Sequence, residues 1–123
     1  MVIEMFESKN LRSLINCLDT IEQNLQTKEK FLASLHLQDK VLSCLLEFSE
    51  ISRSFAWGYL ETITKNALYR INNLVFQQLL IPGVIGIDLY KIWHVTSECL
   101  PIIKDEVNLW ANSKCDFKEL SDR

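Results

Sequence analysis

Residues 62–93 read TITKNALYRINNLVFQQLLIPGVIGIDLYKIW, and this stretch decides the fold. Its first part begins at Thr62 or Thr64 and carries apolar residues at helical spacing as far as Leu80. The segment IPGVIG that follows holds a proline and two glycines, which end this helix and redirect the chain. Asp88 then stands where the N-cap of another helix is expected. The stretch therefore predicts two long helices joined by a loop.

Upstream of this stretch, apolar residues at helical intervals predict three more helices. Their expected ranges are 10–25, 28–35 and 38–56, the second of them short and capped by Thr27. Gly58 marks the break before the fourth helix, because glycine is a poor helix-interior residue.

Downstream, the helix that follows Asp88 repeats apolar residues at intervals of three, four or seven. Pro101 lies inside this pattern and predicts a kink near Ser97, because proline removes a backbone donor. From about residue 112 the sequence is polar, which predicts a frayed tail. We therefore expect residues 1–123 to form one all-α domain, an antiparallel bundle of four long helices and one short helix.

The composition excludes several classes of protein. Hydrophobic residues make up 48% of the chain and charged residues 24%, while three glycines and two prolines are too few for a β-sandwich or barrel. The net charge of −3 is not the basic excess of proteins that bind many phosphates. The first residues lack the order of a signal peptide, and the longest near-apolar run, residues 79–87, is too short to cross a membrane. We therefore expect a cytoplasmic protein with no membrane segment.

The cysteines and histidines predict neither disulfides nor a metal or cofactor site. The four cysteines are widely spaced and are expected to be free thiols, three of them inside apolar helical runs. Neither histidine has a ligand-type residue at metal-binding spacing. These residues are Cys17, Cys44, Cys99, Cys115, His36 and His94.

The fourth helix is apolar around most of its circumference, the pattern of a helix that is buried on two sides. A second copy most simply covers the second side, so we expect a homodimer with Leu74, Phe76 and Gln77 at its interface. Asn72 and Asn73 are poor helix formers in mid-helix. We interpret these two residues as forming a hydrogen bond across the interface, which fixes the register of the dimer. The alternative is that they make a polar contact in a cleft at that interface.

Two segments near the end of the chain carry a resemblance to a known family. Residues 86–93 read GIDLYKIW, and residues 100–104 read LPIIK. They resemble the Gly-x-Asp-x-x-x-x-Trp and Leu-Pro-x-Leu-Lys patterns of the HepT family of HEPN proteins. Residues 48–51, FSEI, are similar to that family's Ile-Gly-Glu-Ala stretch. The resemblance implies a five-helix, homodimeric toxin fold.

The resemblance also implies a chemistry. In HepT proteins an Arg-Asn-x-x-x-His run on the fourth helix lines a cleft at the dimer interface, and its Arg and His cleave RNA without a metal. A histidine can take the proton of an attacking 2′-hydroxyl, and an arginine can stabilise the charge that develops on the phosphate. The usual gene partner is a small nucleotidyltransferase, which adds AMP to a tyrosine two positions after the His.

In this chain the matching stretch lacks all three functional side chains. With Asn72 placed on the family's Asn, Ile71 stands at the Arg, Phe76 at the His and Gln78 at the Tyr. We expect the two catalytic positions on one face of the helix, and neither isoleucine nor phenylalanine transfers protons or binds phosphate.

Three functions are compatible with these observations. The first is a HepT-like component of a toxin–antitoxin or defence module that has lost catalysis and binds protein, with RNA as a weaker alternative ligand; its partners are a second copy and a nucleotidyltransferase. The second is an active metal-independent ribonuclease that uses Arg70, one position early, with His94 of the fifth helix as a candidate base. The third is a structural helical adaptor. The missing Arg/His pair favours the first and the third.

Overall fold

The computed structural model describes residues 8–53, 62–80 and 86–121, with side chains described between residues 11 and 109 of these ranges. The described residues are almost entirely helical and contain no strand. The predicted break at Gly58 and most of the IPGVIG loop lie outside them. The elements are α1 (Ser8–Leu25), α2 (Lys28–Ala33), α3 (Leu35–Ser52), α4 (Thr62–Val75), the π-helical turn η3 (Phe76–Leu80) and α5 (Leu89–Ser121).

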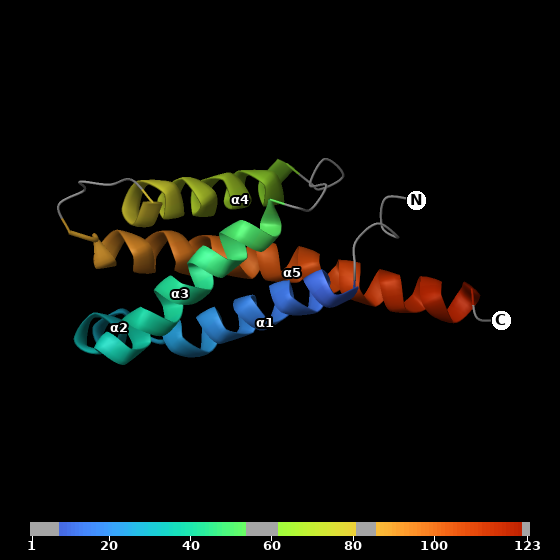
Figure 1. The fold of residues 1–123 in the computed structure, drawn as a ribbon, viewed down its shortest axis with the longest axis horizontal. Coiled ribbons are helices and arrows are strands. Elements are labelled where there is room, and N and C mark those ends of the chain that lie inside the picture. Colours follow the sequence, from blue (N-terminus) through green and yellow to red (C-terminus); the bar gives the residue numbers. More distant parts are fainter. Residues whose placement is uncertain (1–7, 54–61, 81–85, 122–123) are drawn as a thin grey trace.

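The long helices form an antiparallel bundle, as the sequence predicts (Figure 1). The closest packing is between α1 and α3 and between α4 and α5, and α5 also contacts α1 and the short α2. The helix α5 therefore runs between the α1–α3 pair and α4. Within the described ranges, no helix has both the length and the apolar character that a membrane span requires.

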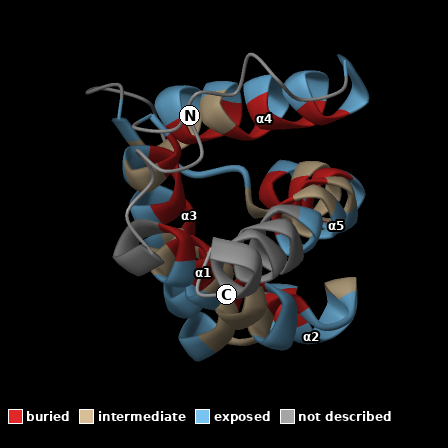
Figure 2. Ribbon diagram, turned by 90° about the vertical axis from the view of Figure 1, so that its right-hand side faces the viewer, coloured by how far each residue is buried: buried red, intermediate tan, exposed pale blue. Residues whose placement is uncertain are grey.

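The core lies where the inward faces of these helices meet (Figure 2). The predicted apolar faces of α1, α3 and α5 are confirmed for most of their periodic residues, which are buried or half-buried. Leu46 of α3 is an exception at 39% exposed, and the predicted core residues Phe55 and Trp110 lie outside the described side chains. On α4 the prediction is confirmed for one side of the helix only. The predicted core residues that are buried are Leu11, Leu14, Leu18, Ile21, Leu25, Val41, Leu45, Phe48, Ala67, Leu68, Ile71, Leu74, Val75, Ile92, Leu100, Ile103 and Val107.

A single residue, Ser34, connects α2 to α3. Its hydroxyl accepts a hydrogen bond from the backbone N–H of Leu37 at 3.2 Å, and its own N–H donates to the carbonyl of Phe31. Because one residue caps both helices, α2 ends two residues earlier and α3 begins three residues earlier than predicted. The side chain of Gln38 completes the corner by donating to the carbonyls of Phe31 and Leu32 at 3.0 and 3.1 Å.

The end of α1 is held by α5. Gln26 has a φ of 49°, the left-handed conformation that often terminates a helix. The indole N–H of Trp93 donates to the carbonyl of Leu25 at 3.3 Å, which satisfies one of the carbonyls left free at a helix C-terminus. The ammonium of Lys104 pairs with Asp19 and Glu22 of α1 at 3.0 and 2.8 Å.

The first turn of α5 is capped as predicted, because the Asp88 carboxylate accepts from the N–H of Lys91 at 3.0 Å. Pro101 lies inside the helix, and the kink near Ser97 stays a prediction. The backbone of α5 is helical as far as Ser121, and the frayed tail from about residue 112 stays a prediction.

The helix α5 contains a buried hydroxyl that lowers the stability of the fold. Thr96 is fully buried on the core-facing side of α5, and its Oγ1 has no hydrogen-bond partner among the described residues. An unsatisfied buried hydroxyl destabilises the fold, and valine has nearly the same shape without it. We expect Thr96→Val to raise the free energy of unfolding by about 1 kcal/mol, measured by urea denaturation.

Ser49→Ala is the matched control, since the buried Ser49 hydroxyl donates to the Asn72 side-chain oxygen at 2.9 Å. This variant should lose about 1 kcal/mol, because it leaves Asn72 without a donor. A Thr96→Val protein less stable than the wild type would contradict the assignment of an unsatisfied group.

Candidate functional site

The helix α4 and the turn η3 have two contrasting faces (Figure 2). The inner face is packed against the bundle. The outer face carries Tyr69, Phe76 and Leu80, which are 72%, 55% and 44% exposed. The expectation that both sides are buried is therefore not met within one chain, and a row of large apolar side chains remains in solvent.

The two positions aligned with the family's catalytic pair lie on different sides of this helix. Ile71 is 1% exposed and belongs to the core, whereas Phe76 points outward. Residues five positions apart are separated by about 140° on an α-helix. The expectation that the pair shares a face is wrong for this reason. The spacing of Ile71 from the buried Ala67, Leu68, Leu74 and Val75 was the sequence signal that could have placed it in the core.

The side chain of Asn72 makes a hydrogen bond within this chain. It is half-buried, and its side-chain oxygen accepts the hydrogen bond from Ser49 of α3. Within one chain Asn72 therefore joins α3 to α4, and its predicted cross-interface role stays a prediction. Asn73 is exposed on the outer face, so it is still available to another molecule.

Of the remaining residues predicted at the interface, one is buried in this chain and one is exposed. Leu74 is 2% exposed and packed in this chain's own core, while Gln77 is exposed at the beginning of η3. The side chain of Gln78, at the family's Tyr position, accepts the backbone N–H of Asp88 at 2.8 Å. This bond ties η3 to the start of α5.

The turn η3 departs from regular α-helix where the family motif would end. Its π-helical geometry over Phe76–Leu80 is rare in proteins and occurs mostly as single turns, frequently at functional sites. The turn begins at Phe76, at the aligned His position.

Arg70, the first alternative catalytic residue, is held in an ion pair. One guanidinium nitrogen lies 2.7 Å from the Glu98 carboxylate of α5, and this hydrogen bond raises the pKa of Arg70. Both side chains are about half exposed, so solvent screens the pair and it can exchange.

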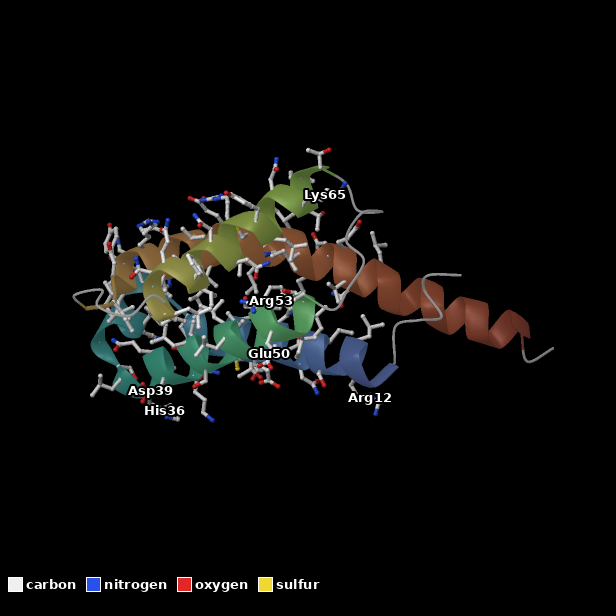
Figure 3. All side chains as sticks on the ribbon, turned by 45° about the horizontal axis from the view of Figure 1, so that its top comes forward. Arg12, His36, Asp39, Glu50, Arg53 and Lys65 are labelled. Atoms are coloured by element: carbon white, nitrogen blue, oxygen red, sulfur yellow. The ribbon has the colours of Figure 1, made fainter. Side chains whose placement is uncertain are left out.

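The ring of His94, the second alternative catalytic residue, contacts two aromatic side chains of its own helix. Its ring centroid lies 4.6 Å from that of Tyr90 and 5.4 Å from that of Trp93. The polar group that α5 presents to Arg70 is the carboxylate of Glu98 and not the His94 imidazole. The other histidine, His36, lies on α3 at the opposite side of the bundle from α4 (Figure 3).

A shallow hollow of about 240 Å³ lies between α4 and α5. Basic and amide side chains supply its polar lining, and two aliphatic side chains supply the rest. The lining residues are Arg70, Asn73, Leu74, Gln77, Lys91 and Val95.

Three of the four cysteines have described side chains, and the pKa of each of these thiols is raised above its ordinary value. Burial raises the pKa of the Cys17 thiol to about 12, with the Glu47 carboxylate as a second cause, and burial also raises the pKa values of Cys44 and Cys99. These three cysteines are free in the structure. Across the described ranges, no three His, Cys, Asp or Glu side chains lie together as metal ligands.

The residues that carry the HepT resemblance make contacts that stabilise this fold. Gly86 has a φ of 75°, a conformation that side chains rarely adopt, and it leads into the Asp88 cap. Trp93 and Lys104 tie α5 to α1, and Leu100 is in the core. These residues therefore contribute to the assembly of the bundle.

Comparison with known proteins gives no match: no protein-family model, no curated protein and no solved structure is significantly similar to this chain.

Restoring the family's Arg and His at positions 71 and 76 should destabilise the fold, because position 71 is in the core. Ile71→Arg places a cation among buried apolar side chains, and we expect it to lower the free energy of unfolding by about 3 kcal/mol or more in urea denaturation. Phe76→His should be within about 0.5 kcal/mol of the wild type, because that position is exposed. An Ile71→Arg protein as stable as the wild type would show that this position is not confined to the core.

Proposed function

We propose that this chain is a helical interaction module that pairs with a second copy through the outer face of α4 and η3, and that it has no ribonuclease activity. The observation that carries the proposal is the exposed row formed by Tyr69, Asn73, Phe76 and Leu80. Their spacing of four, three and four residues is that of a helix–helix seam. Large exposed apolar patches on a protein surface mark interaction sites.

The order of residues in this row suits pairing with itself. If two copies of α4 lie antiparallel across a two-fold axis near Asn73, then Tyr69 of one copy meets Phe76 of the other. The two Asn73 amides then face each other, and an amide can both donate and accept a hydrogen bond. A single polar residue in an apolar seam fixes register, which is the role we assign to Asn73.

The active ribonuclease is the less supported alternative. General base catalysis requires a proton acceptor within hydrogen-bond reach of the attacking hydroxyl. The aligned position holds Phe76, and Arg70 is already paired with Glu98 while His94 is packed against Tyr90 and Trp93. No observation favours a structural adaptor over self-association, and the exposed row of α4 argues against it.

The proposal extends to a HEPN-like, toxin–antitoxin or defence setting in the cytoplasm, with a small nucleotidyltransferase as a further partner. Its support is the sequence resemblance of residues 86–104. Since Gln78 replaces the tyrosine that such enzymes modify, we expect the partner to bind this chain without adding AMP at that position.

Self-association of the chain can be measured in solution. The wild type should elute with a light-scattering mass twice the chain mass of 14.3 kDa at micromolar concentration. Phe76→Asp should give the single-chain mass with the wild-type far-UV spectrum, because it puts a charge into the seam and leaves the core intact. Ile63→Asp is the matched control, since Ile63 is also exposed on α4 but lies outside the row. A wild type of single-chain mass would end the proposal.

Ribonuclease activity can likewise be measured in solution. Purified wild-type protein should show no cleavage of single-stranded RNA in the presence of EDTA, because the acid–base group and the charge-stabilising group are both missing. Cleavage that Arg70→Ala or His94→Ala abolishes would instead establish the active ribonuclease.

A further inference from the structure

The hollow between α4 and α5 has the chemistry of an anion site. Arg70 stands on the α4 side and Lys91 on the α5 side, so one ligand between the helices would meet a cation from each. Gln77 lies two turns after Arg70 on the same helix and adds an amide N–H donor. Among the described residues, those that line the hollow include two cations and no carboxylate, although Glu98 pairs with Arg70 beside it.

The apolar residues of the lining favour a ligand that carries an apolar group beside its negative charge. Leu74 is almost fully buried and Val95 is half-buried, so these two side chains offer an aliphatic surface beneath the polar rim. Charge–charge attraction is stronger beside such a surface than in open water, because low-polarity walls focus the field. The volume of about 240 Å³ suits a small organic anion and not a folded domain.

Two carboxylates interact with residues that line the hollow. Glu98 pairs with Arg70 at 2.7 Å, and Asp88 is engaged with the first turn of α5, where it accepts the Lys91 backbone N–H. The Glu98 carboxylate is therefore the anion that Arg70 holds when nothing else is bound. Because this pair is half exposed, a ligand with more negative charge can take the place of Glu98.

We propose that the hollow binds a small phosphate monoester, with the phosphate between Arg70 and Lys91 and the organic group over Leu74 and Val95. A phosphate carries nearly two negative charges near neutral pH and three acceptor oxygens, and an arginine can bind it with two hydrogen bonds. A single carboxylate such as Glu98 offers less charge to the same two cations. All six lining residues belong to one chain, and of these only Asn73 also belongs to the row proposed as the dimer seam.

Calorimetric titration with phenyl phosphate, inorganic phosphate and benzoate tests the proposal. Phenyl phosphate should bind saturably with a Kd in the millimolar range or below. Inorganic phosphate should bind about tenfold more weakly, since it lacks the group that covers Leu74 and Val95, and benzoate should bind more weakly still. Equal affinity for the two phosphates would reject the aliphatic part of the site.

Matched variants locate the binding. Lys91→Gln and Arg70→Gln should each weaken phenyl phosphate about tenfold, and Glu98→Gln should tighten it several-fold by removing the competing carboxylate. Lys65→Gln makes the same charge change near the first turn of α4, away from η3 (Figure 3), and should leave the Kd unchanged. No saturable binding to the wild type or to Glu98→Gln, or an equal loss in Lys65→Gln, would overturn the proposal. Phe76→Ser should keep the wild-type Kd, which separates this site from the proposed dimer.

Discussion

The burial of the Ile71 side chain fixes how α4 is turned about its own axis, and the surroundings of every other residue on that helix follow from it. Ile71 packs into the core with Leu74 and Val75, so the positions between and beyond them must face elsewhere. Asn72 then turns toward α3 and bonds Ser49, while Arg70 turns toward α5 and pairs with Glu98. Phe76 and Tyr69 are left on the outside. Because Phe76 stands five positions after Ile71, about 140° further round an α-helix, the rotation that buries Ile71 leaves Phe76 in solvent.

The segments that carry the resemblance to HepT proteins are held by interactions within the bundle. The residues that resemble the HepT pattern act here as a left-handed turn, a helix cap, a carbonyl donor and an interhelical ion pair, at Gly86, Asp88, Trp93 and Lys104. Such tasks assemble the bundle and place α5 between its neighbours. They do not supply a proton acceptor. The proposals of self-association and of an anion site therefore rest on what the outer face of α4 and the hollow beside α5 present to solvent.

Several features of the fold were accessible from the sequence because they depend on residues close together in the chain. Apolar periodicity identified the helices and the buried faces of α1, α3 and α5, and the Asp88 cap could be predicted from its place before a periodic run. The corner at Ser34 was missed because one serine serves two helices at once. The carbonyls that Gln38 satisfies belong to the preceding helix, so nothing in its own periodic run marks it as buried.

The sequence by itself determined that the chain is helical, where each helix lies to within a few residues at its ends, and that the aligned catalytic positions hold Ile71 and Phe76. The tertiary structure decided which side of α4 enters the core, that Arg70 meets Glu98 and Asn72 meets Ser49, and that a hollow remains between α4 and α5. The physical reason is the range of the interactions. Helix formation and capping are local, whereas the rotation of a helix and the partners of its polar residues depend on neighbours 20 to 30 residues away: Ser49 and Asn72 are 23 positions apart, and Arg70 and Glu98 are 28.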